Sequence, residues 1–213
     1  MRGHDSAPNY LWAALISLLW VAPLMPGAFA HGINGHIHVT AWAVDSLPEG
    51  ELKTFLQDPE LRNAVLFGAV FPDTAFIVDD HYGELAHWEP FIEAYIQHMV
   101  NEESPYTERN AQKKLAFILG VAAHGLQDEL FDTLFLPLVH KHDGLGQDEA
   151  DPGTDAFFHT DGYTQESPMR DYPATLLVDL YESAFDHEIS EALLDQGITL
   201  TSSYISTIDS IAR

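Results

Sequence analysis

Apolar residues recur at helical spacing along most of this chain, and no stretch alternates with the period of two that a strand requires. The pattern predicts helices at 39–47, 51–57, 59–66 and 87–99, a long helix from about 107 to 135, and a short one at 151–159. From 172 to 213 the helical pattern is interrupted near Asp186 and Gly197. We therefore expect a multi-helix, all-α fold.

Proline and polar residues mark where several of these helices begin. Asp58 before Pro59 predicts a side-chain cap followed by a proline at the first helical position. Asp151 before Pro152 repeats the arrangement, so we expect a helix to begin there. The stretch 141–149 between Pro137 and that helix is expected to be a polar loop.

The long helix contains the row that most needs an explanation. His124, Asp128 and Asp132 are four residues apart within an otherwise apolar segment, so they share one face of the helix. Buried ionisable groups of this kind must be neutralised, because each would otherwise cost several kcal/mol. Two interpretations are open: a hydrogen-bonded core histidine with two carboxylates at a solvated end, or a metal site.

The first thirty residues are predicted to be a secretory signal peptide. Arg2 precedes an apolar run over 10–21, and Ala28-Phe29-Ala30 matches a cleavage signature. The run is too short for a permanent membrane span. We expect cleavage after Ala30, a secreted or periplasmic location, no transmembrane anchor after processing, and one domain over 31–213. An uncleaved N-terminal anchor is the alternative.

Charge restricts the partners of that domain. Residues 31–213 keep the net charge of −24, because the first thirty contain one basic and one acidic residue. So few Lys and Arg side chains disfavour stable binding of double-stranded nucleic acid and adsorption to anionic membranes. The chain has no cysteine and thus no disulfide, so bound cations are a candidate means of stabilisation.

Further candidate ligands are distributed along the chain, and each has an ordinary structural interpretation. After cleavage His31 would offer its α-amino group as well as its imidazole, although a hydrated chain end is equally compatible with it. Asp73 follows a proline and could be a turn residue, and His87 could be a cap. The other candidates, which lie in or near predicted helices, are His36, Asp151, Asp155 and His159.

Five of these segments, taken in order, resemble the zinc-dependent phospholipase C family. They are GINGH at 32–36, GAVFPD at 68–73, HWEPF at 87–91, FILGVAAHGLQD at 117–128 and the helix beginning at Asp151. The pattern most resembles the N-terminal catalytic domain of glycosylphosphatidylinositol-specific phospholipase D. The resemblance implies a multi-helix phospholipase C or single-strand-nuclease-like fold with a metal cluster in a cleft.

The resemblance also implies two or three zinc ions, held in three sets of ligands. Asp73, His87, His124 and Asp128 match one complete set, and His36, His31 and a bridging Asp128 match a second. The third set departs from the family, because its matching residues are Asp132, Asp151 and Asp155, with His159 as a possible additional ligand. Three carboxylates favour Mn²⁺, Mg²⁺ or Ca²⁺ over zinc at that position.

The function implied is that of an exported metal-dependent phosphodiesterase. It would hydrolyse a phospholipid or a glycosyl-phosphatidylinositol-like headgroup by a metal-bound hydroxide, and Asp73 is the candidate to orient or deprotonate the attacking water. A nuclease or phosphomonoesterase on the same scaffold is an alternative. A non-catalytic metal-binding domain is another.

Overall fold

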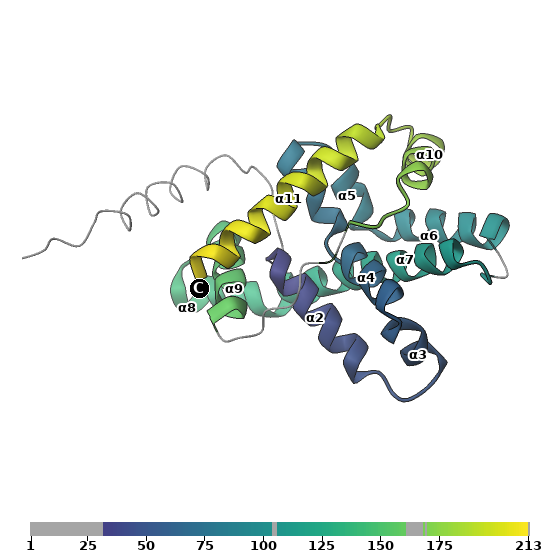
Figure 1. The fold of residues 1–213 in the computed structure, drawn as a ribbon. Coiled ribbons are helices and arrows are strands. Elements are labelled where there is room, and N and C mark those ends of the chain that lie inside the picture. Colours follow the sequence, from purple (N-terminus) through teal and green to yellow (C-terminus); the bar gives the residue numbers. More distant parts are fainter. Residues whose placement is uncertain (1–31, 104–105, 161–167, 169, 213) are drawn as a thin grey trace, which may run out of the picture.

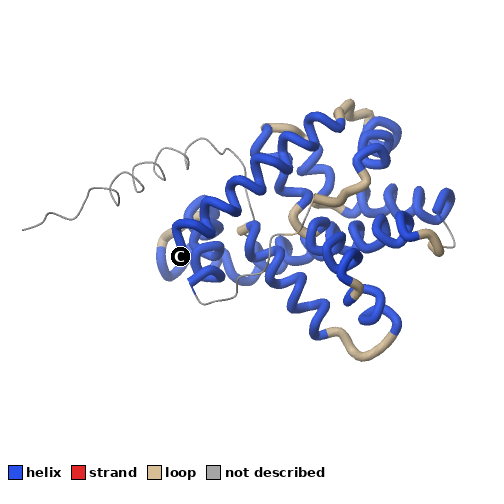
Figure 2. Tube along the Cα trace, viewed as in Figure 1, coloured by secondary structure: helices blue, strands red, loops and turns tan. Residues whose placement is uncertain are grey.

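The computed structural model describes residues 32–103, 106–160, 168 and 170–212. Within them every regular element is helical, as Figure 2 shows, so the predicted all-α class is confirmed. In chain order (Figure 1) they are α2 (Ile33–Ser46), α3 (Glu51–Gln57), α4 (Pro59–Gly68), η2 (Phe71–Val78), α5 (Tyr82–Ala86), α6 (Glu89–His98), η3 (Met99–Glu103), α7 (Arg109–Leu130), η4 (Phe131–Phe135), α8 (Leu136–Asp143), α9 (Gln147–Thr160), α10 (Ala174–Phe185) and α11 (Glu191–Ala212). The predicted signal peptide and His31 lie outside the described residues.

Helix α7 is the centre of the arrangement, and it crosses α4 at very short range. Glycines make this possible: a Cβ atom on Gly68 would lie 2.0 Å from the carbonyl oxygen of Phe117, and one on Gly120 would lie 2.0 Å from that of Val65. No side chain therefore separates the two backbones at the crossing. The position of α4 relative to α7 is thereby closely defined.

Two of the three apolar clusters among the described residues fill the space around these helices. The larger is rich in aromatic residues and joins η2, α5, α6, α7, α10 and α11, with Tyr82, Phe91 and Tyr181 fully buried. The smaller lies between α2, α3, α4 and α7. Burial of such side chains is the main stabilising term, at about 1.5–3 kcal/mol for each large apolar side chain.

The cap predicted at Asp58 is confirmed, whereas the one predicted at Asp151 is wrong. Asp58 accepts backbone hydrogen bonds from Glu60 and Leu61 at the start of α4. Helix α9 instead begins at Gln147, with Pro152 inside it, and α8 reaches Asp143, so the expected loop at 141–149 is much shorter. The Glu149 carboxylate accepts the backbone N–H of Gly146 at 2.9 Å, so the cap of α9 lies five residues before Asp151.

Two other predicted boundaries are corrected. Helix α2 begins at Ile33 rather than 39, because its first N–H groups are satisfied by a carboxylate from α9, described below. The predicted interruption at Gly197 is absent, since α11 runs through it. A Cβ atom there would lie 2.4 Å from the Thr74 carbonyl oxygen, so this glycine serves close packing of α11 on η2. The interruption at Asp186 is confirmed, as its φ of 52° ends α10.

Among the described residues, no single helix has both the length and the apolar character needed to cross a bilayer. The pair α4 and η2, which meet at a bend of 45°, satisfies the same length and composition test together.

Candidate metal centre

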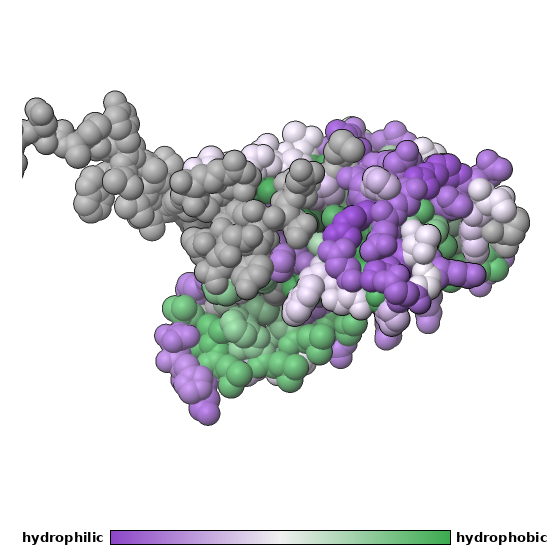
Figure 3. Space-filling view, turned by 60° about the horizontal axis from the view of Figure 1, so that its bottom comes forward, coloured by the Kyte–Doolittle hydropathy of each residue, from purple (hydrophilic) through white to green (hydrophobic). Residues whose placement is uncertain are grey.

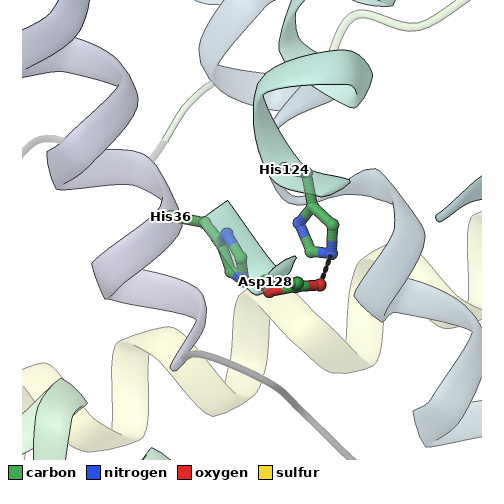
Figure 4. A group of neighbouring side chains, drawn as sticks. All are labelled: His36, His124 and Asp128. Atoms are coloured by element: carbon green, nitrogen blue, oxygen red, sulfur yellow. Dashed lines mark ion pairs between the residues drawn. The ribbon is translucent and has the colours of Figure 1, made fainter. Parts of the chain in front are cut away.

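Five of the predicted side chains converge at one point in the interior. They come from four separate segments: His36 from α2, Asp73 from η2, His87 from the end of α5, and His124 and Asp128 from α7. Figure 4 shows His36 facing His124 and Asp128 across the gap between their helices. Two overlapping groups have the spacing of metal ligands, namely His36, His124 and Asp128, and Asp73, His87 and His124.

Local structure explains how these side chains are aimed. His124 and Asp128 are one turn apart on α7, so both project from the same face. Asp73 follows Pro72 in the first turn of η2, and its carboxylate is buried. His87 ends α5, and Gly125 allows close approach there, because a Cβ atom on Gly125 would lie 2.7 Å from the His87 carbonyl oxygen.

Asp128 has contacts with all three histidines. Its carboxylate oxygens lie 3.2 Å from Nε2 of His36, 3.4 Å from Nε2 of His87 and 3.1 Å from Nε2 of His124. The Asp73 oxygens lie slightly farther from the same three nitrogens, at 3.7–3.8 Å. Two carboxylates therefore face the Nε2 edges of three imidazoles.

Backbone carbonyls fix the orientation and tautomer of two of these rings. Nδ1 of His124 donates to the Ala69 carbonyl at 2.8 Å, and Nδ1 of His87 donates to the Gly83 carbonyl at 2.7 Å. A carbonyl oxygen can only accept, so the proton of each neutral ring is on Nδ1. The Nε2 lone pairs are left facing the centre, which is the arrangement of a metal-ligating histidine.

Burial and charge act in opposite directions on these groups. Burial disfavours the protonated form of His124, but Asp128 and Asp73 outweigh it and raise its pKa to about 9. Burial, followed by the charge of His124, lowers the pKa of His36. Burial opposes ionisation of Asp128, but His124 and His36 prevail and hold its pKa well below the usual range.

The buried carboxylates at this centre lack the partners that would compensate their charge, which favours a bound divalent cation. Among the described residues, both oxygens of Asp73 and of Asp128, together with one oxygen each of Asp151 and Asp155, are buried and accept no hydrogen bond. In the part of the chain that the structure describes, every ion pair of a lysine or arginine is with a carboxylate outside this group of four. Buried carboxylates lacking such partners require another source of positive charge.

Asp151 and Asp155 bring more negative charge to the same region. Burial, followed by the charge of Asp73, raises the pKa of Asp151 to about 9. Burial likewise raises that of Asp155 to about 7, against the lowering effect of backbone hydrogen bonds. These bonds come from the N–H groups of Asn34 at 2.9 Å and Gly35 at 3.3 Å, so Asp155 also caps α2.

Asp132 is placed differently from the other members of its row. The chain changes from the α7 helix to the wider π turn of η4 after Leu130, and Asp132 is exposed while His124 and Asp128 are buried. The row predicted on one α-helical face is therefore interrupted before its third member. Partial burial and the charge of Asp128 nevertheless raise the pKa of Asp132, so it lies at the rim of the site. The His159 side chain and His31 lie outside the described residues.

Sequence reasoning did not identify the groups that support the cluster. The Ala69 and Gly83 carbonyls have no side-chain signal, because any residue supplies a carbonyl. Gln127 donates to Thr40 Oγ1 at 2.9 Å and links α7 to α2 beside the site, and the contact depends on how the helices pack. The sequence indicates these two residues only by their position: Thr40 lies one turn after His36, and Gln127 directly precedes Asp128.

The part of the chain that contributes these five residues is the part that matches a known family. The family described as zinc dependent phospholipase C matches residues 35–131. The resemblance predicted from the sequence is thus confirmed for this segment. All five side chains of the cluster lie within it, from His36 to Asp128.

Three curated proteins are similar in sequence to this chain over a small part of their own length. Phosphatidylinositol-glycan-specific phospholipase D of Mus musculus is 29% identical over 128 residues, which are 55% of this chain and 15% of the mouse protein. Its counterparts in Rattus norvegicus and Bos taurus are 28% and 27% identical over 58% of this chain. The match spans about 15% of the length of each of these relatives. No solved structure matches the chain.

Proposed function

We propose that this protein is a metal-dependent phosphodiesterase that hydrolyses a phospholipid or a glycosyl-phosphatidylinositol-like headgroup. The observation that carries the proposal is the convergence of three imidazole Nε2 edges on two buried carboxylates, within the segment that matches zinc-dependent phospholipase C. The similarity to phosphatidylinositol-glycan-specific phospholipase D supports the same substrate class.

The ligand set that we propose divides the site into two parts. Asp73, His87, His124 and Asp128 would hold one zinc ion, and His36 with Asp128 a second, completed by His31 in the processed chain. Asp132, Asp151 and Asp155, with His159 as a possible addition, would hold a third ion, for which oxygen ligands favour Mn²⁺, Mg²⁺ or Ca²⁺. When bound, such ions supply positive charge to the phosphoryl oxygens and lower the pKa of water toward neutrality.

The chain itself would position the substrate and the water. The side chains of His87 and Asp128 are 11% exposed, while those of His36, His124 and Asp73 are at most 1% exposed, so the centre opens on the side of His87 and Asp128. Asp73 lies at the closed end with no hydrogen bond to its oxygens from the described residues. We assign to it the orientation or deprotonation of the attacking water.

Export is part of the proposal. Residues 1–30 would be removed as a signal peptide, which makes His31 the first residue of the domain 31–213 in a secreted or periplasmic protein. N-terminal sequencing and intact mass of the released protein test this step. A released chain that begins several residues away from His31 would remove the proposed α-amino ligand.

Hydrolysis assays test the activity directly. The purified protein with zinc should hydrolyse a chromogenic phosphodiester and a phospholipid, and Asp128→Asn should reduce both rates at least 100-fold. Asp179→Asn, the same change at an exposed aspartate of α10, is the matched control and should leave both unchanged. Hydrolysis of single-stranded DNA without phospholipid hydrolysis would indicate a nuclease instead. Zinc binding without hydrolysis of any phosphate ester would indicate a non-catalytic domain.

A further inference from the structure

A row of exposed leucines follows the end of α7 into α8. Leu126, Leu130, Leu134 and Leu138 are spaced by four residues, and each is at least 50% exposed. Phe135 adds to them at 45% exposed. We call these five side chains the α7–α8 apolar face. Figure 3 shows the corresponding continuous apolar area at the end of the molecule where α8 lies.

The core does not account for this composition. Helix α8 begins Leu-Pro-Leu-Val, yet it contains no buried residue. Of η4, only Phe131 is buried. Exposed apolar residues scattered singly are ordinary, whereas a contiguous row of this kind marks a surface that another apolar phase covers.

Charge indicates which partner fits. Between Leu126 and Leu138 the exposed acidic residues are Glu129 and Asp132, whereas 133–142 contains no Asp or Glu and includes Lys141 and two histidines, in a chain whose net charge is −24. A second copy of the chain would bring another −24 to this small face, so self-association is opposed by repulsion. A zwitterionic phospholipid layer has no net charge and offers an apolar interior. The face therefore suits a lipid surface better than a second copy.

Two leucines of the face lie on α7, the helix that also carries His124 and Asp128 of the candidate site. Leu126 and Leu130 each lie two residues from Asp128, which places them on the opposite side of α7 from the site. A lipid surface on this side would lie about one helix diameter, roughly 10 Å, from the ligands. Asp132 lies at the rim, between Leu130 and Leu134.

We propose that the α7–α8 apolar face docks this protein on a zwitterionic phospholipid surface, with its leucines in the interfacial region of the lipid layer. The choice of lipid rests on the proposed function, since the substrate of a phospholipid hydrolase is found in such a layer. Docking would hold the site close to the headgroups while it leaves the ligand set unchanged.

Sedimentation with vesicles tests docking without any need for turnover. The full chain is produced with its natural N-terminal segment and loaded with zinc, its N-terminus is determined by mass, and binding is measured to vesicles of a non-hydrolysable phosphatidylcholine analogue. The variant carries Leu134→Ser and Leu138→Ser together. The control is Leu52→Ser, because Leu52 is 51% exposed on α3 and lies outside the face.

The double variant should bind the vesicles at least tenfold more weakly than the parent, and Leu52→Ser should bind as the parent does. Hydrolysis of a water-soluble, short-chain phosphodiester should remain within twofold in all three proteins, which separates docking from catalysis.

Equal vesicle binding by parent and double variant would overturn the proposal, as would an equal loss in Leu52→Ser. A parent that is dimeric in sedimentation velocity and does not bind vesicles would overturn it in favour of a second copy. Vesicle binding that depends on the face in a protein with no hydrolytic activity would contradict the proposed function and leave docking supported.

Discussion

The Nε2 atoms of His87 and His124 lie 2.9 Å apart, and the Nδ1–H group of each ring donates a hydrogen bond to a backbone carbonyl. Two lone pairs at this distance repel unless a proton or a metal ion lies between them. Two imidazole nitrogens bound to one zinc ion at about 2.0–2.1 Å are about 3.3 Å apart at the tetrahedral angle and about 2.9 Å apart at an angle near 90°. The spacing of this pair therefore fits two ligands of a single ion.

Removal of metal should destabilise the folded protein. Without cations the carboxyl groups of Asp73, Asp128, Asp151 and Asp155 remain close together. Each must either stay charged beside like charges, at about 4 kcal/mol for a pair 4 Å apart at an effective dielectric constant of 20, or be protonated against its usual pKa. We expect the melting temperature to fall by about 10 °C in chelator, given about 2–4 °C per kcal/mol for a chain of this size. Calorimetry with elemental analysis measures both quantities. An unchanged melting temperature after verified loss of metal would contradict a shared cluster.

Substitutions on α7 should separate ligands from neighbouring residues. His124→Ala should remove at least one metal ion per chain and reduce turnover at least 100-fold, because its Nε2 belongs to both groups with ligand spacing. Asp132→His should leave turnover detectable and shift the metal preference toward zinc, since Asp132 lies at the rim and imidazole favours zinc. Mass spectrometry of metal content in both variants is the measurement. Full metal content in His124→Ala would show that the histidine is only a core residue.

Asp151 and Asp155 should respond oppositely to substitution in the metal-free protein. Asp151 has a pKa raised to about 9, so near pH 7 its buried carboxyl takes up a proton when the metal-free protein folds. Asp151→Asn removes the free-energy cost of that protonation and should leave the metal-free melting temperature equal or higher. Asp155 accepts two N–H groups at the start of α2, so Asp155→Ala should destabilise the protein by about 1 kcal/mol with or without metal. Thermal unfolding in chelator compares the two variants. A lower metal-free melting temperature for Asp151→Asn would show that its carboxylate stabilises the fold by itself.

Stability of the metal-free protein should fall as the pH rises from 6.5 to 9. The pKa of Asp151 is raised from 3.8 to about 9 and that of Asp155 to about 7, so the folded state holds protons that the unfolded state has released. The pKa of His124 is raised from 6.5 to about 9, and the stability it contributes is likewise lost through this range. Each extra proton held by the folded state corresponds to about 1.4 kcal/mol per pH unit. Urea unfolding at several pH values in chelator measures the slope, and a stability that rises over this interval would contradict these assignments.

The all-α class and the five converging residues could be predicted because both depend on local signals. Helical periodicity marks α7, and the ordered motifs mark the segments that contribute His36, Asp73 and His87. Whether all five are ligands is a proposal that the substitutions above test. The wider turn after Leu130 was missed, because nothing in a Phe-Asp-Thr-Leu-Phe sequence distinguishes a π turn from an α turn. The early start of α2 was missed because its cap, Asp155, is 121 residues from Asn34.

The glycine crossing of α4 and α7 determines which changes this centre can tolerate. The Ala69 carbonyl, which accepts the hydrogen bond from His124, belongs to the residue directly after Gly68. The position of this carbonyl is therefore set by the contact between the two backbones. Substitutions of ordinary side chains elsewhere cannot easily alter this spacing, because no side chain takes part in it. Divergence in metal preference would therefore proceed through the carboxylates at the rim, while the histidine-lined interior stays fixed in its dimensions.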